Sequence, residues 1–278
     1  MANQKLAELL KGRMTEDEIS FIPSAYDTVG DILIFSEFPD EIKKHEKAVS
    51  EAIFKFKPNI KVILKKTKKY SGKFRLPKFK VIGGEKRQET IFRENGCIFR
   101  IDLGKCYFSP RLSEERKRVF SLVNPDEKVL VMFSGIGISP ITISKNSQAK
   151  EVYGVELNPA AHKFAEINAK LNKCKNVKLF CGDVNVVVPK LKKKFNRILM
   201  PLPKDADSFL DVALKAVKKK GIIHFYDFEE EGKFEKVVEK IEKICSKEKK
   251  KISVLNVQKC GQYAPRIFRV CVDFGVLN

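Results

Sequence analysis

The chain has 278 residues, 43% of them hydrophobic, and it carries 55 Lys and Arg against 35 Asp and Glu, a net charge of +20. This length allows one large hydrophobic core with a smaller module beside it. The positive charge exceeds what solubility requires and favours a polyanionic partner, with nucleic acid the leading candidate. A lysine-rich thermophile proteome, with its solvated ion-pair networks, would give a similar balance, and the two explanations are compatible.

Membrane and secreted classes are disfavoured by the sequence. No apolar run approaches the roughly eighteen residues that span a bilayer, and residues 1–5 (MANQK) lack the apolar stretch of a signal peptide. We therefore expect a soluble, cytoplasmic protein. The seven cysteines are scattered and include no C-x-x-C pair, which favours small buried side chains over zinc ligands or disulfides. We expect no metal site.

The first part of the chain predicts a short extension, residues 1–21, followed by a small α+β domain, residues 22–108. An apolar run predicts a strand at 32–35, and helical spacing of apolar residues predicts a helix over 41–54. Further strands are predicted at 61–64, 79–82 and 97–103.

A basic segment at residues 65–80 has the composition of an RNA-contacting surface, because aromatic residues alternate with its positive charges. We assign Lys68 and Lys69 of this segment to contact with RNA.

Residues 109–278 predict a larger α/β domain. After a helix that reaches about residue 122, strands and helices alternate strictly, as expected for a doubly wound, Rossmann-like sheet covered on both faces. A terminal hairpin after five such units is the arrangement of class I methyltransferases. The predicted strands lie at 129–133, 151–156, 177–180, 197–200 and 221–226, followed by a helix over 233–246 and two β-like runs at 251–257 and 266–274.

The turn after the first of these strands predicts a nucleoside-binding site. Its glycines allow a tight turn and close approach of a ligand to the backbone. Glu156 ends the next strand about twenty residues later, where a carboxylate accepts hydrogen bonds from ribose hydroxyls. Asn158 and Pro159 then favour a helix start that places Glu156 between strand and helix, and we assign Leu157 to cofactor binding together with Glu156. The residues of the turn are Phe133, Ser134, Gly135, Ile136 and Gly137.

The cofactor predicted for this turn is S-adenosylmethionine. Dinucleotide sites need a third glycine near the pyrophosphate, and here Gly137 is followed by residues 138–140 (ISP). S-adenosylmethionine has no phosphate and does not need that glycine. Asp183, after the third strand, is placed to accept the adenine amino group. A glycine turn with purely structural acids is the alternative, in which Glu156 and Asp183 cap helices.

The fourth strand ends in residues 200–203 (MPLP), where nucleotide-modifying methyltransferases carry an N-P-P-Y-like loop. With that loop, the chain resembles archaeal tRNA (guanine-N1)-methyltransferases, which modify the guanosine 3′ of the anticodon, tRNA position 37. The resemblance covers roughly residues 26–274, and sister enzymes of wyosine biosynthesis share the scaffold. The other motifs that carry it are residues 72–77 (GKFRLP), 93–96 (RENG), 107–111 (YFSPR), 155–159 (VELNP) and 263–266 (YAPR).

The resemblance implies a catalytic apparatus. Guanine N1 holds its proton at neutral pH, so methylation needs a base at N1 and a positive donor at O6. By resemblance, Glu115 is that base and Arg75 that donor, with Pro201 and Pro203 beside the target base. The alternatives are an ordinary helical ion pair of Glu115 with Arg118, a phosphate contact for Arg75, and prolines that only end a strand.

The resemblance also implies how the substrate is held. Tyr107 lies near the cofactor or the target base, although a Tyr-Phe pair before a helix is more often part of a core. Arg111, Tyr263 and Arg266 contact the RNA, against the alternative of solvated charges. The implied partner is tRNA, mainly its anticodon stem-loop, bound by a monomer.

Two departures from the family pattern bear on function. Val131 stands where relatives carry an acid near the methionine end of the cofactor, and Pro201 stands where many carry Asn. A proline-type loop resembles the subgroup that also methylates C7 of a tricyclic wyosine precursor. The alternatives are an aminocarboxypropyltransferase of the wyosine pathway and an inactive RNA-binding module, which only Val131 favours.

Overall fold

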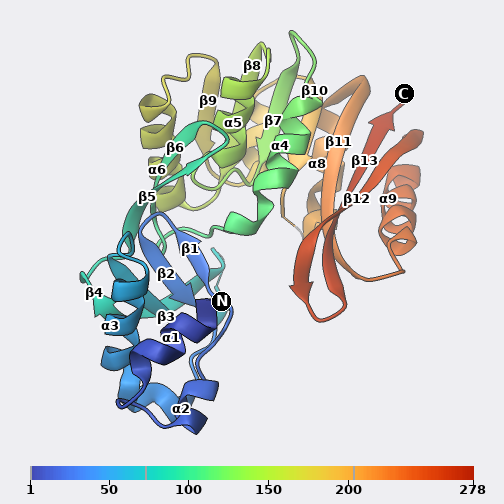
Figure 1. Ribbon diagram of the computed structural model, residues 1–278. Coiled ribbons are helices and arrows are strands. Elements are labelled where there is room, and N and C mark those ends of the chain that lie inside the picture. Colours follow the sequence, from blue (N-terminus) through green and yellow to red (C-terminus); the bar gives the residue numbers. More distant parts are fainter. Residues whose placement is uncertain (1, 73, 203) are drawn as a thin grey trace. The chain divides into compact units, whose positions relative to one another are not determined.

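The computed structural model describes the backbone of residues 2–72, 74–202 and 204–278, and the side chains of these residues except 2–4 and 69–71. The chain divides into two compact units (Figure 1). The first unit comprises residues 1–93 and 98–110, and the second comprises 94–97 and 111–278.

The first unit is a small α+β fold around a sheet of order β1-β2-β3-β4. β2 and β3 are parallel, and the two outer pairs are antiparallel. Leu33 and Ile63 of the sheet share one hydrophobic core with Val49 of α3 and Leu10 of α1, so the N-terminal helix packs into this unit. The elements are α1 (Ala2–Leu10), α2 (Glu16–Ser20), β1 (Asp27–Val29), β2 (Ile32–Phe35), η1 (Asp40–His45), α3 (Glu46–Phe56), β3 (Val62–Ser71) and β4 (Leu76–Gly84).

A two-stranded ribbon follows this sheet. It is formed by β5 (Glu89–Glu94) and β6 (Cys97–Asp102), and its tip, Glu94–Cys97, belongs to the second unit. The sequence did not predict β5, because charged residues at both ends obscure the alternation of its buried residues Thr90 and Phe92.

The second unit is built on a seven-stranded sheet of order β12-β13-β11-β10-β7-β8-β9. The five strands β7 to β11 are parallel to one another, and β13 is antiparallel to both β11 and β12. The predicted fold class, a Rossmann-like α/β domain with a smaller N-terminal α+β domain, is confirmed. The elements are η2 (Pro110–Leu112), α4 (Ser113–Ser121), β7 (Lys128–Met132), α5 (Ile138–Asn146), β8 (Glu151–Glu156), α6 (Pro159–Leu171), β9 (Val177–Cys181), α7 (Val184–Lys190), β10 (Phe195–Met200), η3 (Ala206–Phe209), α8 (Leu210–Ala216), β11 (Val217–Glu230), α9 (Glu235–Lys247), β12 (Ile252–Ala264) and β13 (Ile267–Val276).

The two faces of this sheet carry different side chains, because successive residues of a strand point to opposite sides. On β7, Leu130 and Met132 join a core with α7, α8 and α9, whereas Val129 and Val131 join a core with α4 and α5. Phe225 and Phe274 lie in the first core, and their neighbours on the same strands therefore face the side of α4. That side of β11 and β13 carries buried polar residues, which build the site described below.

Strands β11 and β12 are longer than the sequence predicted. Lysines at 218–220 and the acids Asp227, Glu229 and Glu230 flank the apolar part of β11, so its charged ends show no clear hydrophobic pattern. Within the part of the chain that the structure describes, no helix combines the length and apolar character needed to cross a bilayer.

Candidate active site

The glycine turn, residues 133–137, links β7 to α5 through backbone conformations that favour glycine. Gly135 has φ 56° and Gly137 has φ 82°, both in the left-handed region. A Cβ on Gly137 would lie 3.0 Å from the Cβ of Ala165, so α6 packs directly against the turn. A Cβ on Gly135 would meet no described atom within 4 Å, which leaves space for a ligand at that backbone. Phe133, at the start of the turn, also has a positive φ. Its ring packs edge-on against the ring of Phe209.

Glu156 ties the ends of two neighbouring strands together. Its Oε2 accepts a hydrogen bond from the backbone N–H of Gly135 at 2.7 Å, and its Oε1 accepts one from that of Asn158 at 2.8 Å. Burial raises the pKa of Glu156, and these backbone donors oppose the rise. Asn158 caps α6 and Pro159 occupies its first turn, as predicted, with Leu157 half-buried beside them. The carboxylate is thus held at the end of β8 by backbone groups.

Asp183 lies at the same edge of the sheet. The N–H of Gly182 donates to the backbone oxygen of Glu156 at 2.8 Å, which keeps the ends of β8 and β9 together. Asp183 caps α7, and its Oδ1 accepts from the N–H of Asn185 at 2.8 Å. The capping role considered for Asp183 is therefore present, and it uses one oxygen of the carboxylate.

An unpartnered polar atom marks the glycine turn as a binding site. Ser134 is 7% exposed, and its Oγ has no hydrogen-bond partner among the described residues. Buried polar atoms are almost always satisfied, so this hydroxyl is suited to bind a polar group of a ligand. Together with the open space at Gly135 and the acceptor Glu156, it fits a ligand that carries hydroxyl and amino groups, as S-adenosylmethionine does.

A second part of the site is a small cavity of about 40 Å³ that contains Glu115. Glu115 is buried on α4, and Pro201, which follows β10, lines the same cavity. The structure therefore brings these two predicted residues together; Pro203 lies outside the described residues. The other lining residues are Leu112, Arg116, Val119, Ser139, Thr142, Ile143, Leu199, Tyr226 and Arg269. We call this the Glu115 cavity.

The carboxylate of Glu115 is fixed by two side chains. Arg118 donates from Nε to Oε2 and from Nη2 to Oε1, each at 2.8 Å. The hydroxyl of Tyr226 donates to Oε1 at 2.6 Å, and burial raises the pKa of Tyr226 well above its ordinary value, which keeps this donor protonated. A carboxylate has about four acceptor positions, and three are filled. Oε2 therefore keeps one position for a further proton donor.

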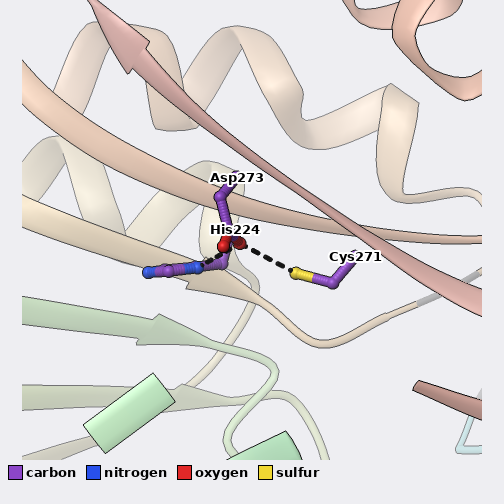
Figure 2. Close-up of side chains that lie close together, drawn as sticks. All are labelled: His224, Cys271 and Asp273. Carbon is purple, nitrogen blue, oxygen red and sulfur yellow. Dashed lines mark hydrogen bonds and ion pairs between the residues drawn. The ribbon is translucent and has the colours of Figure 1, made fainter. Parts of the chain in front are cut away.

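The ion pair with Arg118 is the ordinary helical contact that the sequence offered as an alternative, but it continues into a larger network. Arg118 Nη1 also donates to Asp273 Oδ2 at 2.6 Å. Asp273 Oδ1 lies 2.6 Å from Nδ1 of His224 (Figure 2). Burial opposes ionisation of Asp273, yet hydrogen bonds from His224 and Arg118 outweigh it and hold the pKa of Asp273 well below its usual range.

The tautomer of His224 follows from its other neighbour. Arg197 Nη1 lies 2.8 Å from His224 Nε2, and a guanidinium can only donate. Nε2 is therefore the acceptor, and Nδ1 carries the proton that is donated to Asp273. Arg197 is in turn bound to Glu127 at 2.7 Å. Hydrogen bonds and ion pairs therefore connect Glu127, through these side chains, to Glu115.

His224, Cys271 and Asp273 lie close enough to hold a metal ion, but their partners favour a hydrogen-bond cluster (Figure 2). Arg197 occupies the free nitrogen of His224, and Arg118 contacts Asp273. Burial raises the pKa of the Cys271 thiol, so it stays protonated and donates to Asp273. Two guanidinium cations beside the cluster disfavour a further cation there.

The prediction of buried cysteines is confirmed for four of them and wrong for Cys181. Cys181 is exposed because it ends β9, the outer strand of the sheet. Cys174 and Cys260 are half-buried, and the four buried cysteines are Cys97, Cys106, Cys245 and Cys271.

The basic segment of the first unit forms the β3–β4 hairpin, and only part of it is available to RNA. Lys65 is 7% exposed and bound to Glu46 at 2.6 Å, and Lys80 binds the same carboxylate at 2.7 Å. These two lysines serve the fold, because they neutralise a half-buried acid on α3. Lys68 is exposed on β3, and the side chain of Lys69 lies outside the described part. Arg75 is half-buried in the turn before β4, with φ 51°.

The remaining predicted RNA contacts lie on the surface of their units. Tyr107 and Arg111 are exposed, so Tyr107 is not a core residue. Tyr263, 61% exposed on β12, stacks on Phe228 with 4.1 Å between ring centroids. Arg266 occupies the turn between β12 and β13 and lies 3.4 Å from a carboxylate oxygen of Glu230.

Sequence reasoning missed Tyr226, His224, Arg269 and Asp273. They lie on β11 and β13 at alternate positions and face α4. A signal was present, since these polar residues interrupt otherwise apolar strands, but their partners are far away in the sequence.

Comparisons with known proteins cover both units. A family model described as the TRM5/TYW2 methyltransferase domain matches residues 90–255, and one described as the TYW2 N-terminal domain matches residues 6–87. The tRNA (guanine(37)-N(1))-methyltransferase Trm5b of Pyrococcus abyssi is 38% identical over 92% of this chain and 76% of its own length.

Two further relatives carry related activities in their names. The tRNA(Phe) (4-demethylwyosine(37)-C(7)) aminocarboxypropyltransferase of Methanocaldococcus jannaschii is 34% identical over 89% of this chain and 96% of its own length. The tRNA (guanine(37)-N(1))/4-demethylwyosine(37)-methyltransferase Taw22 of Nanoarchaeum equitans is 32% identical over 90% of this chain and 98% of its own length.

Solved structures match over nearly the whole chain. The complex of aTrm5 and tRNALeu has a TM-score of 0.85 at 32% identity, covering 99% of this chain and 79% of the other. The M. jannaschii TYW2 in complex with AdoMet has a TM-score of 0.71 at 28% identity, covering 91% of this chain and 100% of the other.

Proposed function

Because the chain belongs to the TRM5/TYW2 methyltransferase family, we propose that it is a tRNA methyltransferase that transfers a methyl group to N1 of guanosine 37. The observation that carries this proposal is the Glu115 cavity. It holds a buried carboxylate with one open acceptor position beside Pro201, in the same unit as the glycine turn and Glu156.

The cofactor is S-adenosylmethionine, as the sequence predicted, and it supplies a methyl group bound to a sulfonium sulfur. We assign its ribose hydroxyls to Glu156 and its adenine amino group to Asp183. The residues 133–137 contribute backbone N–H groups and the unpartnered Oγ of Ser134. Val131 is fully buried in β7, so these groups carry the polar recognition that an acid at that position would share.

The methyl transfer needs removal of one proton from the base. The N1–H bond breaks and its proton goes to Oε2 of Glu115, N1 bonds to the methyl carbon, and the sulfur keeps the electron pair of its broken bond. Arg118 and Tyr226 keep the carboxylate in place while this happens. Negative charge builds on O6 of guanine during the step, and by resemblance Arg75 donates to that oxygen. Such acid–base and electrostatic contributions are each worth roughly 10²-fold or more in rate.

The partner is tRNA. We propose further that contact centres on the anticodon stem-loop and that the protein acts as a cytoplasmic monomer. The exposed positions that support RNA contact are Lys68, Tyr107, Arg111, Tyr263 and Arg266, and Lys69 is assigned with them from its place in the sequence.

A second candidate function is aminocarboxypropyl transfer from the same cofactor. The match of residues 6–87 to a TYW2 N-terminal domain favours it. The presence of both Arg75 and Glu115 and the loop at 200–203 (MPLP) favours methyl transfer. The same loop favours a further methylation of C7 on the tricyclic wyosine precursor.

One assay separates these functions. Purified protein is incubated with an unmodified tRNA transcript and cofactor labelled either in the methyl group or in the aminocarboxypropyl group, and nucleoside 37 is identified by mass spectrometry. We expect N1-methylguanosine with the methyl label alone. Transfer of the other label, or no label at guanosine 37, would contradict the proposal. Transcript that already carries the tricyclic precursor tests the C7 activity.

A further inference from the structure

Arg269 is a largely buried arginine that forms no ion pair with the described residues. Four buried side-chain atoms in the described part of the chain have no hydrogen-bond partner, and two of them, on His45 and Glu46, lie in ion pairs. The other two are Ser134 Oγ in the glycine turn and Arg269 Nε. Arg269 is 8% exposed and lines the Glu115 cavity.

Other arginines of this unit differ from Arg269 because each of them binds an acidic side chain. Arg197 binds Glu127, Arg118 binds both Glu115 and Asp273, and Arg116 binds Glu94. Arg269 takes part in none of the ion pairs found among the described residues. A largely buried guanidinium without an acidic partner among the described residues is available to bind a group from outside the protein.

The fold holds Arg269 beside the catalytic carboxylate. In the antiparallel pair β11–β13, His224 lies opposite Asp273, Tyr226 opposite Cys271 and Phe228 opposite Arg269. Directly opposed residues point to the same face, so these pairs form one row facing α4. The row leads from the buried network to the carboxyl end of β11, where open α/β sheets bind their ligands.

The guanidinium of Arg269 is also fixed in orientation. It lies over the ring of Phe228, 5.3 Å from the centroid, and that ring stacks on Tyr263. A guanidinium held over an aromatic ring still has its N–H groups available for other acceptors. Arg269 is thereby prepared to bind an oxygen that enters the Glu115 cavity.

We infer that Arg269 is a catalytic residue that binds O6 of the target guanine while negative charge builds on that oxygen. This inference rests on the proposed function. O6 is attached to the ring carbon next to N1, so a cation in the cavity of the N1 base is adjacent to O6. The second unit then contains its own charge-stabilising donor.

The test compares Arg269→Met with Val270→Ala in single-turnover methyl transfer to a tRNA transcript. Methionine keeps a long, unbranched apolar side chain beside Phe228 and removes the guanidinium with its charge and N–H donors. Val270 is the buried neighbour on the opposite face of β13, so its truncation reports loss of stability alone. We expect Arg269→Met to slow transfer about 100-fold without lowering the melting temperature, because an unpaired charge is removed. Val270→Ala should melt earlier and retain its rate within about threefold.

Binding measurements identify what Arg269 contacts. Affinities for the tRNA transcript and for S-adenosylhomocysteine should change less than threefold in Arg269→Met. A weaker affinity for transcript with an unchanged rate at saturation would indicate a phosphate contact, and a weaker affinity for S-adenosylhomocysteine a contact with the cofactor carboxylate. Either result overturns the inference, as would an unchanged rate with a lower melting temperature. Absence of transfer by the wild type would overturn the proposed function as well.

A modified substrate locates the contact on the base. Replacing O6 of guanosine 37 by sulfur weakens its capacity to accept hydrogen bonds. The wild type should lose rate with this transcript, and Arg269→Met should lose less. Equal losses in both proteins would contradict contact with O6.

Discussion

The glycine turn with Glu156 and the Glu115 cavity lie in the same unit, but different interactions hold their carboxylates. Glu156 accepts hydrogen bonds from the backbone of Gly135 and Asn158. Among the described residues, Glu115 accepts from two side chains, those of Arg118 and Tyr226. Any sequence that adopts the turn supplies the backbone N–H donors, whereas each side-chain donor depends on the identity of one residue. Single substitutions can therefore remove the groups that hold Glu115 one by one.

The largest effect is expected for Glu115→Gln. The amide keeps the size of the side chain but cannot take the proton from N1. We expect the single-turnover rate of methyl transfer to fall by 10²-fold to 10⁴-fold. Glu114→Gln is the matched control, because Glu114 is the exposed neighbour on the same helix. A rate for Glu115→Gln within about threefold of the wild type would remove Glu115 from its assigned role.

The next effect concerns stability. Asp273→Asn removes the negative charge that Arg118 and His224 share, and breaking a buried pair in this way costs about 3 kcal/mol. The free energy of unfolding, measured in urea, should fall by that amount. Asp211→Asn breaks the exposed pair with Lys215 and should change stability by less than about 1 kcal/mol. Equal losses in the two variants would mean that the buried network contributes no more than a surface pair.

The same difference explains which parts were predictable from the sequence. The glycine turn, Glu156 and the cap at Asn158 form a local pattern within one β-α-β segment, so spacing alone located them. Glu115 and Pro201 were assigned by resemblance, and the structure places both in one cavity.

Tyr226, Asp273 and Arg269 escaped prediction because their contacts join β11, β13 and α4 across long stretches of chain. A polar residue in an apolar strand has no visible partner until the strands are paired. For the same reason the sequence could not separate Lys65 and Lys80, which bind Glu46, from the exposed lysine at 68.

The stability of the buried network should depend on pH through His224. Burial lowers the pKa of His224 below its ordinary 6.5, and the hydrogen bond to Asp273 only partly offsets this. Just below pH 6.5 the unfolded chain therefore binds more protons than the folded one. Stability should be lost as the pH falls from 6.5 toward the folded pKa, with a slope of at most about 1.4 kcal/mol per pH unit.

His224→Gln isolates this contribution, because an amide can still donate to Asp273 and accept from Arg197 but does not titrate. Urea unfolding is measured on both sides of pH 6.5 for the variant and the wild type. The difference in their free energies of unfolding should change with pH in the predicted direction. A constant difference would show that His224 does not stay neutral in the folded protein.

The smallest effect is expected at the exposed β3–β4 hairpin of the first unit. Lys68→Gln should weaken binding of the tRNA transcript only a few-fold. If Lys68 contacts one phosphate, the slope of log affinity against log salt should fall by roughly 0.7 to 0.9. Lys215→Gln, an exposed lysine on α8, should leave that slope unchanged. An unchanged slope for Lys68→Gln would remove this residue from the RNA-binding surface.

The assignment of cofactor binding to Glu156 and of proton removal to Glu115 is tested most directly by calorimetry. S-adenosylhomocysteine is titrated into the variants Glu156→Gln and Glu115→Gln. Hydrogen bonds to a charged group contribute about 1.5 to 3 kcal/mol, so Glu156→Gln should bind at least tenfold more weakly than the wild type. Glu115→Gln should bind within about twofold of the wild type. Equal weakening in the two variants, or full affinity in Glu156→Gln, would contradict the assignment of cofactor binding to Glu156 and of chemistry to Glu115.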